Sequence, residues 1–149
     1  MNTNNIAKSL SIAALISVTA CTNLVDSTHK QITLNDQQTL GVNFTWKDTS
    51  RCLGSSPEFT LTKVPENTQT LAFTLRDIYF PFFPHGGGEL EYTGDNTIPI
   101  GTVAAAKGHY IGPCAPPFFP GQYKFTVEAL DSNGLLLGKG NATRPFPHR

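Results

Sequence analysis

The chain has 149 residues, with 11 basic and 11 acidic side chains, so its formal net charge is zero. It contains no basic run, and this scattered charge argues against a nucleic-acid partner. The chain is rich in Gly (13), Pro (11) and Phe (10) and has one Met, a composition that favours strands and turns over helices.

The first 20 residues are typical of an export signal, with one cation at Lys8 and an apolar run over residues 10–18. This run is shorter than the roughly 20 apolar residues that span a bilayer. Residues 18–21 (Val-Thr-Ala-Cys) resemble the lipobox of bacterial lipoproteins, in which the cysteine receives a diacylglycerol and the peptide is cut before it. The resemblance implies that Cys21 is lipidated and anchors the protein to a membrane. An ordinary signal peptide with a chance cysteine is the alternative.

We therefore expect three segments: a lipoprotein signal peptide at residues 1–20, a lipidated tether at 21–31, and a single β-sandwich domain at 32–149. Because processing removes Lys8, ten basic residues would face eleven acidic ones, a net charge of −1. The anchor would place the protein in the bacterial cell envelope. Thr22 rather than Asp follows the cysteine, which favours the periplasmic face of the outer membrane.

Two cysteines, Cys52 and Cys114, remain once Cys21 is assigned to lipid. In the oxidising compartment of an exported protein a pair of this kind is expected to form a disulfide, and two buried free thiols are the alternative. A bridge closing a loop of this length would stabilise the fold by roughly 4 kcal/mol. The four histidines show no ligand spacing, so we expect no metal site and no cofactor.

Alternation of apolar and polar residues predicts a series of short strands. These are residues 31–34, 40–46, 59–62, 70–77, 89–92, 122–130 and 135–141. Residues 80–88 and 108–120 are predicted to be loops, because proline removes a backbone donor and glycine weakens a strand. Residues 98–106 could end in a short helical turn. The pattern predicts an all-β fold, an antiparallel β-sandwich with little helix.

Several stretches follow one another in an order that a known family shares. They are residues 51–59 (Arg-Cys-Leu-Gly-Ser-Ser-Pro-Glu-Phe), 63–66 (Lys-Val-Pro-Glu), the strand ending at Asp77, 108–117 (Gly-His-Tyr-Ile-Gly-Pro-Cys-Ala-Pro-Pro) and 122–131 (Gln-Tyr-Lys-Phe-Thr-Val-Glu-Ala-Leu-Asp). Over about residues 50–134 they resemble the phosphatidylethanolamine-binding protein family, particularly its bacterial Raf-kinase-inhibitor-like branch. The resemblance implies a sandwich of that type, and it independently brings the two cysteines together.

In that family a shallow cavity at one end of the sandwich takes phosphate- or carboxylate-bearing groups. The resemblance therefore implies a site for a small anionic ligand or a phospholipid headgroup. Its expected lining is Asp77, His85, Gly86, Gly112, Pro116 and Tyr123, within a loop that extends to residue 117. Glycine-rich backbone can direct N–H groups at an anion, and a histidine adds a donor. We expect Asp77 to hold the ring of His85, and the alternative is that His85 is an exposed loop residue.

The sequence also departs from the family pattern. The family's Asp-Pro-Asp-x-Pro turn reads Asp-Ile-Tyr-Phe-Pro at residues 77–81, its second pocket histidine falls on Gly121, and its C-terminal helix and final strand have no counterpart. Either the ligand has changed, or the pocket is vestigial in a structural or interaction domain with a protein partner, such as an inhibitor or an assembly subunit. Residues 120–134 alone would also suit an immunoglobulin-like envelope domain.

Five phenylalanines fall in the two loops expected beside the pocket: Phe80, Phe82, Phe83, Phe118 and Phe119. They either form an exposed apolar rim that meets lipid or a partner, or belong to the core, and we expect at least three in the core. Residues 85–88 spell the oxyanion-loop string of some α/β-hydrolases. The sequence has no Gly-x-Ser-x-Gly elbow and no alternation of strands with helices, so we do not expect an enzyme.

Overall fold

The computed structural model describes residues 38–115, 118–119 and 121–146. The signal peptide, Cys21, the tether, the strand predicted at 31–34 and Pro116 all lie outside these residues and stay predictions. Within the described ranges, no helix has the length and apolar character needed to cross a membrane.

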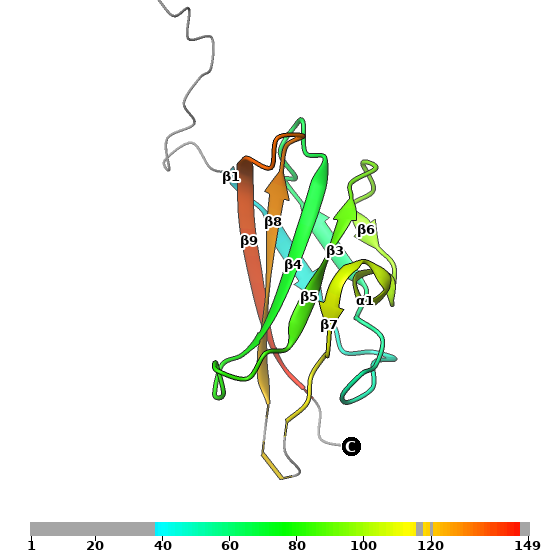
Figure 1. The fold of residues 1–149 in the computed structure, drawn as a ribbon, viewed down its shortest axis with the longest axis vertical. Helices are drawn as coiled ribbons and strands as arrows, with labels where there is room; N and C mark the ends of the chain where they lie inside the picture. Colours follow the sequence, from blue (N-terminus) through cyan, green and yellow to red (C-terminus); the bar gives the residue numbers. More distant parts are fainter. Residues whose placement is uncertain (1–37, 116–117, 120, 147–149) are drawn as a thin grey trace, which may run out of the picture. The chain divides into compact units, whose positions relative to one another are not determined.

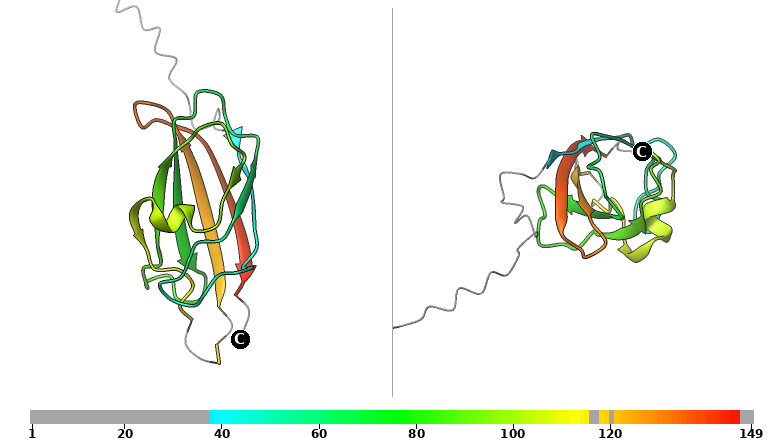
Figure 2. Two further views of the ribbon diagram at one scale, coloured as in Figure 1. Left: turned by 90° about the vertical axis from the view of Figure 1, so that its right-hand side faces the viewer. Right: turned by 90° about the horizontal axis from the view of Figure 1, so that it is seen from above.

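Two β-sheets face each other across a shared core (Figures 1 and 2). The larger sheet contains, in spatial order, β1 (Gln38–Thr39), β9 (Leu136–Pro145), β8 (Gln122–Leu130), β4 (Thr70–Asp77), β5 (Gly86–Glu91) and β7 (Lys107–Tyr110). The smaller sheet contains β2 (Gly41–Phe44), β3 (Phe59–Thr62) and β6 (Thr97–Ile98). A single helical turn, α1 (Thr102–Ala105), lies against β5 and β7. The predicted all-β sandwich with little helix is confirmed.

Among the described strands, β1 runs parallel to β9 and all other pairs are antiparallel. Gln38 is the register partner of Gly138 there. Directly after β1, the buried Leu40 donates its N–H to the carbonyl of Lys139 over 3.1 Å, and β2 then continues in the other sheet. The short parallel strand is therefore the point where the chain passes from one sheet to the other.

The core forms because alternate residues of the long strands point between the sheets. In β4 and β8 these inward residues are Leu71, Phe73, Leu75, Tyr123, Phe125, Val127 and Ala129, all buried. Phe125 lies near the centre, with its ring centroid 5.0 Å from that of Phe44 and 4.7 Å from that of Phe59, both from the smaller sheet. Nearly perpendicular ring pairs of this kind join the sheets and add to the stability that their burial gives.

Two glycine-rich segments that the sequence predicts as loops are strands instead. Gly86–Gly88 begin β5, and Gly108 lies inside β7. A Cβ on Gly87 would overlap the carbonyl of Phe73, and one on Gly108 would lie 2.8 Å from the carbonyl oxygen of Gly87. The strands β4, β5 and β7 can approach this closely only because these positions are glycine. Glycine more often weakens a strand, since it has no side chain to pack.

The strand register defines two opposite ends of the sandwich. Asp77 pairs with Tyr123, and Tyr123 pairs with Arg144, next to the loops at residues 78–85 and 111–121. We call this the loop end. Gln38 pairs with Gly138, six residues earlier along β9, which is roughly 20 Å away at the rise of a strand. The chain therefore enters the larger sheet at the end opposite the loop end.

Candidate functional site

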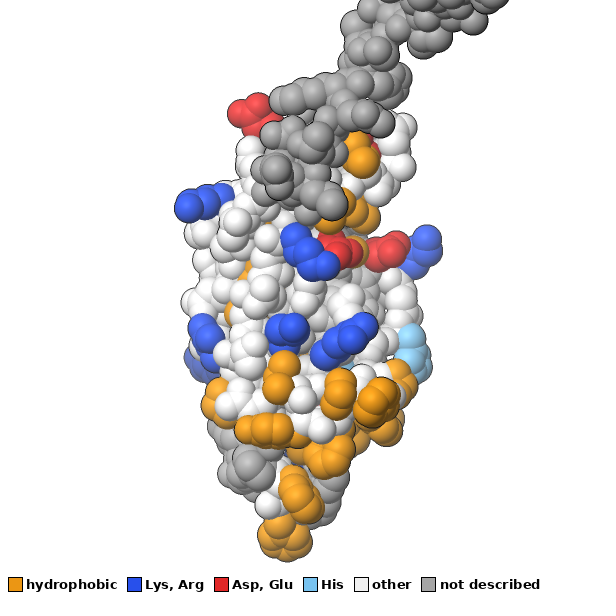
Figure 3. Space-filling model, turned by 90° about the vertical axis from the view of Figure 1, so that its left-hand side faces the viewer, with side chains coloured by type: hydrophobic (Ala, Val, Ile, Leu, Met, Phe, Trp, Pro, Cys, Tyr) orange, Lys and Arg blue, Asp and Glu red, His pale blue; other side chains and the backbone are white. Residues whose placement is uncertain are grey.

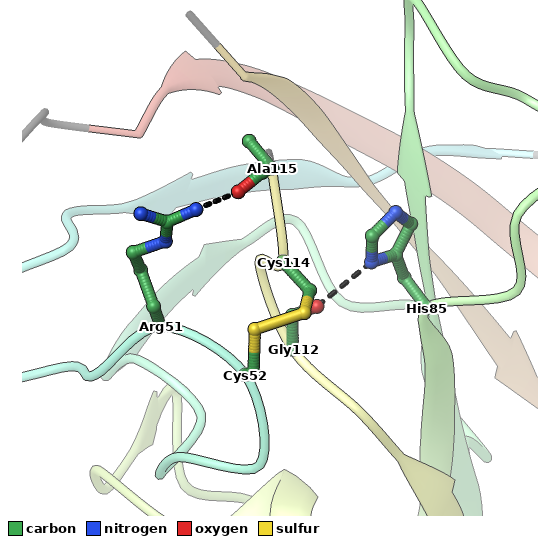
Figure 4. Close-up of a disulfide and its surroundings, with 6 residues drawn as sticks. All are labelled: Arg51, Cys52, His85, Gly112, Cys114 and Ala115. Carbon is green, nitrogen blue, oxygen red and sulfur yellow. Dashed lines mark hydrogen bonds between the residues drawn. A yellow bond between two sulfur atoms is a disulfide. The ribbon is translucent and has the colours of Figure 1, made fainter. Parts of the chain in front are cut away.

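A disulfide joins Cys52 to Cys114 across 62 residues, as the sequence predicts (Figure 4). Two backbone hydrogen bonds run beside it, from the N–H of Cys52 to the carbonyl of Pro113 over 2.9 Å and from Leu53 to Ile111 over 2.7 Å. Arg51 adds a hydrogen bond from its guanidinium to the carbonyl of Ala115. The loop after β7 is thus fixed to the segment before β3, and this loop forms one wall of the site.

His85 is buried, with 2% of its surface exposed, so the alternative of an exposed loop residue is wrong. Its Nδ1 lies 2.8 Å from the carbonyl oxygen of Gly112, which Figure 4 shows pointing at the ring. Because a carbonyl only accepts, Nδ1 carries the proton. In the neutral ring Nε2 is then an acceptor, and in the charged ring it is a second donor.

Asp77 ends β4 and is also buried, but its role differs from the expected one. Its Oδ1 accepts the backbone N–H groups of Tyr79 over 2.7 Å and of Phe80 over 3.1 Å. The expectation that Asp77 holds the ring of His85 is wrong, because the loop after β4 turns back on the carboxylate and the Gly112 carbonyl takes the histidine. A short acidic side chain that caps its own turn in this way is common at the end of a strand.

Tyr123 lies between these two residues. It is the register partner of Asp77, and its ring centroid is 5.1 Å from that of His85 in an edge-on arrangement. Its surface is fully buried, yet among the described residues no group forms a hydrogen bond with its hydroxyl oxygen. Burial, then the negative charge of Asp77 and the closeness of its carboxylate, raise the pKa of Tyr123 to about 12, while the nearby Cys114 N–H and Arg51 lower it. Asp77 and Cys114 are thus close to the hydroxyl, but neither meets it with the geometry of a hydrogen bond.

Gly121 explains one departure from the family pattern. A Cβ at this position would lie 3.0 Å from the hydroxyl oxygen of Tyr123 and would overlap its ring. The ring of Tyr123 therefore occupies the space that a side chain at 121 would need. The family's second pocket histidine could not be accommodated here unless Tyr123 moved.

Two glycines of the expected site have mainly backbone roles. Gly112 has φ 81°, a conformation that favours glycine, and presents its carbonyl to His85. Gly86 has φ 72° and lies so close to the His109 carbonyl that a Cβ would overlap it. Pro116, the remaining residue of the predicted site, is outside the described part of the chain. The structure thus brings Asp77, His85, Gly112 and Tyr123 into one buried cluster, with Gly86 beside His85.

A cavity of about 330 Å³ opens next to this cluster. It is lined by Thr74, Leu75, Arg76, Pro81, Phe82, Phe83, Pro84, His85 and Gly86. His85 connects the two features, because it lines the cavity while its ring lies edge-on to Tyr123. Within the described ranges, no three His, Cys, Asp or Glu side chains come together as a metal site would require.

Arg76 is the cavity residue that the sequence reasoning missed. It follows the buried Leu75 in β4, so the alternation of the strand already places its side chain on the outer face at the loop end. Its direct cross-strand partner is Lys124 of β8. Directly opposite residues of antiparallel strands share a face, so Lys124 lies beside Arg76 on the outer face, and of the two only Arg76 lines the cavity.

The five loop phenylalanines are all exposed, and the expectation that at least three belong to the core is wrong. Phe82 is 99% exposed and Phe118 is 96% exposed, and Phe80, Phe83 and Phe119 are 45–57% exposed. The ring of Phe80 lies 6.4 Å from that of Phe119, so the two loops touch each other. The five phenylalanines instead form an exposed apolar rim, which is the other arrangement that the sequence allows.

No protein-family model and no curated protein sequence matches the chain. Solved structures do match its fold. One is a phosphatidylethanolamine-binding protein homologue from Chlamydia trachomatis, CT736, with a TM-score of 0.56, 15% identity, and coverage of 74% of this chain and 99% of that one. Another is YbcL of Escherichia coli, described as a member of the mammalian phosphatidylethanolamine-binding protein family, with a TM-score of 0.53, 20% identity, and coverage of 75% and 100%.

The likeness extends over nearly the whole of each of these bacterial proteins and three quarters of this chain. At such low identity it establishes the arrangement of the strands and not the ligand. The likeness also decides between the phosphatidylethanolamine-binding-like and the immunoglobulin-like sandwich, which the sequence leaves open. The chain has the phosphatidylethanolamine-binding-like β-fold.

Proposed function

We propose that this protein is an envelope lipoprotein whose β-sandwich binds a small anionic ligand, inorganic phosphate or the phosphate of a phospholipid headgroup, without catalysing a reaction on it. The observation that carries the proposal is the buried hydroxyl of Tyr123, which has no hydrogen-bond partner among the described residues and lies beside His85.

A buried polar group without a partner typically costs about 1–3 kcal/mol of stability. Native proteins keep few of them, and each requires an explanation such as a missing ligand. A phosphate or carboxylate oxygen near Tyr123 would accept a hydrogen bond from its hydroxyl and remove this cost. Neutral pH lies far below the Tyr123 pKa of about 12, so the hydroxyl is protonated and able to donate.

The groups around Tyr123 complement such an anion. The Gly112 carbonyl holds Nδ1 of His85, so Nε2 is free either to accept from a protonated phosphate oxygen or, in the charged ring, to donate to an ionised one. Arg76 at the cavity and Lys124 opposite it lie on the outer face of the same strands, away from the Tyr123 hydroxyl, and add positive charge to the loop end as a whole.

The envelope location is supported by the lipobox-like residues 18–21 and by the disulfide. Disulfides persist in exported proteins and are rare in the reducing cytosol. If Cys21 is lipidated, metabolic labelling with a radioactive fatty acid will label the chain, and Cys21→Ser will abolish the label.

Nuclear magnetic resonance of the full chain carrying Cys21→Ser tests the ligand site. We expect inorganic phosphate and phosphoethanolamine to shift the His85 ring resonances in a saturable way, and Tyr123→Phe to weaken binding by about tenfold through loss of one hydrogen bond. Tyr110→Phe is the matched control, because Tyr110 also carries a buried hydroxyl without a described partner but stacks on Phe125 in the core. His85 resonances that do not respond to either ligand would contradict the proposal.

A second candidate is a structural or interaction domain with a vestigial pocket and a protein partner. The exposed phenylalanines at the loop end favour it, because apolar patches on a monomer often mark interaction sites. In that case added phosphate would not shift the His85 resonances of the wild type or of either tyrosine variant.

A further inference from the structure

The loop end carries an unusually apolar surface. Its exposed apolar side chains, which we call the aromatic tip, are Ile78, Tyr79, Phe80, Phe82, Phe83, Phe118 and Phe119. They come from two loops that touch through Phe80 and Phe119. Figure 3 shows hydrophobic side chains covering this end of the molecule. Exposure of this many large apolar groups in water is unfavourable, so a monomer rarely keeps them without a use.

We propose that the aromatic tip inserts into the surface of a membrane that contains anionic lipids. This contact is separate from the acyl anchor expected at Cys21 and does not require the ligand site around Tyr123. Three features favour a lipid surface over a protein partner: the charges beside the tip, the hydrogen bonding of its main loop, and the place where the chain enters the domain.

The exposed charges beside the tip on the outer face of the larger sheet are positive, while the carboxylate of Asp77 is buried and bonded to the loop. Arg76 and Lys124 lie opposite each other, one strand position before the loop end. Figure 3 shows a row of Lys and Arg side chains next to the hydrophobic end, with the acidic side chains further away. Like charges directly across two strands destabilise a sheet, and lipid phosphates would offset that repulsion. Apolar side chains flanked by cations are typical of proteins that lie in the interface of an anionic bilayer.

The backbone N–H groups of the loop at residues 78–84 are largely prepared for an apolar environment. Ile78 donates its N–H to Gln122, Tyr79 and Phe80 donate theirs to Asp77, and Phe83 donates to Phe80. Pro81 and Pro84 have no N–H. With four donors paired and two prolines, six of the seven residues have no free N–H. An unpaired backbone group is costly in lipid, where water is absent, whereas a protein partner could supply acceptors of its own.

The chain enters the described part of the domain at the end away from the tip. Gln38 lies at the opposite end of the larger sheet, roughly 20 Å along the strands from Asp77. The segment between Cys21 and Gln38 has 16 residues, and such a length can extend to about 55 Å. An anchor at Cys21 would therefore allow the domain to turn its tip toward a lipid surface.

The experiment places a reporter in the tip. The full chain carrying Cys21→Ser has one tryptophan, Trp46, which is buried. We would compare Phe82→Trp with Leu135→Trp, since Leu135 is exposed on the β8–β9 turn at the other end. Vesicles of phosphatidylcholine with phosphatidylglycerol, and of phosphatidylcholine alone, would carry brominated acyl chains that quench tryptophan in contact with them.

We expect anionic vesicles to shift the Phe82→Trp emission to shorter wavelength and to quench it, with little change for Leu135→Trp. Phe82→Ser combined with Phe118→Ser should weaken the binding of anionic vesicles by about a hundredfold, about tenfold for each partly inserted ring, whereas Leu135→Ser should not weaken it. Lys124→Ser should weaken it about fivefold and Lys63→Asn, at the far end, should not.

Equal quenching at positions 82 and 135, or vesicle binding that the tip variants do not change, would overturn the proposal and assign the binding to the N-terminal segment. A short-wavelength emission from the residue introduced by Phe82→Trp without vesicles, after the emission of the buried Trp46 in the parent chain is subtracted, would also overturn it, because another part of the chain would then cover the tip. Tyr123→Phe separates this proposal from the ligand site: it should weaken phosphate binding and leave vesicle quenching unchanged.

Discussion

The Nδ1 of His85 donates a hydrogen bond of 2.8 Å to the carbonyl of Gly112, 27 residues away in the sequence. This contact connects the last residue of the β4–β5 loop to the loop that the disulfide holds. Because Nδ1 is bound to the Gly112 carbonyl, Nε2 is the ring nitrogen of His85 that can contact a ligand.

Removal of this hydrogen bond should destabilise the protein. His85→Phe keeps a buried ring but leaves the Gly112 carbonyl without its side-chain partner, so we expect the free energy of unfolding to fall by about 1–3 kcal/mol. His109→Phe, on the exposed part of β7, should change it by less than about 0.5 kcal/mol. Urea denaturation followed by circular dichroism gives both values, and equal effects would contradict the assigned role of His85.

The disulfide should contribute the largest single covalent constraint. Replacing Cys52 and Cys114 together by Ala should lower the free energy of unfolding by about 4 kcal/mol, because the bridge closes a long loop in the unfolded chain. The same denaturation experiment with and without a reducing agent measures it. In the double variant a reducing agent should have no further effect, and a wild-type protein indifferent to reduction would count against the bridge.

Alkaline pH should destabilise the fold through its buried tyrosines. The pKa of Tyr123 is raised from 10.0 to about 12, mainly by burial, and burial also raises the pKa of Tyr110. A raised folded-state pKa means that the folded protein holds its proton more tightly than the unfolded chain does. The stabilisation is thus complete below pH 10 and is lost as the pH rises toward about 12.

Melting temperatures between pH 8 and pH 12 test this, on roughly the interval that the Tyr123 pKa shift defines. Tyr110→Phe with Tyr123→Phe should flatten the decline, because the unfolded chain then no longer gains by ionising these two groups. Absorbance of tyrosinate should show two tyrosines that ionise only as the protein unfolds. A decline of the same steepness in the double variant would refute the explanation.

The glycines of β5 and of the turn after it should differ sharply in their tolerance of a methyl group. Gly87→Ala would press a Cβ into the backbone of Phe73, so the strands must move apart, and we expect a loss of about 2–4 kcal/mol. Gly94 has a positive φ of 96°, but no atom lies within 4 Å of the place that a Cβ would take, so Gly94→Ala should cost only about 1 kcal/mol of backbone strain. Thermal unfolding of the two variants makes the comparison.

The long strands of this fold could be predicted because their side chains alternate. Residues 70–77 and 122–130 match β4 and β8 at both ends. Gly86–Gly88 could not be recognised as strand, since the property that matters is close approach to the backbone of neighbours that lie far away in the sequence. Local composition does not contain that information, and it favours a loop.

The site could be predicted only in part for a similar reason. The resemblance to a known family pointed to Asp77, His85, Gly112 and Tyr123, which lie together. The partner of His85 depended on how two loops fold against each other, and so the wrong acceptor was expected. The exposure of Phe82 and Phe118 was missed because a phenylalanine is usually buried, and a sequence does not reveal the loops that carry it outward.

The larger sheet ends in short strands on both sides. Within the described part of the chain, β1 contributes two residues at one edge and β7 contributes four at the other, beginning with the charged Lys107. Long, flat edges let sheets of separate molecules join through their free backbone groups. The strands β1 and β7 therefore offer neighbouring copies few backbone groups, and the part of β9 beyond Lys139, which β1 does not cover, is the longer stretch of edge.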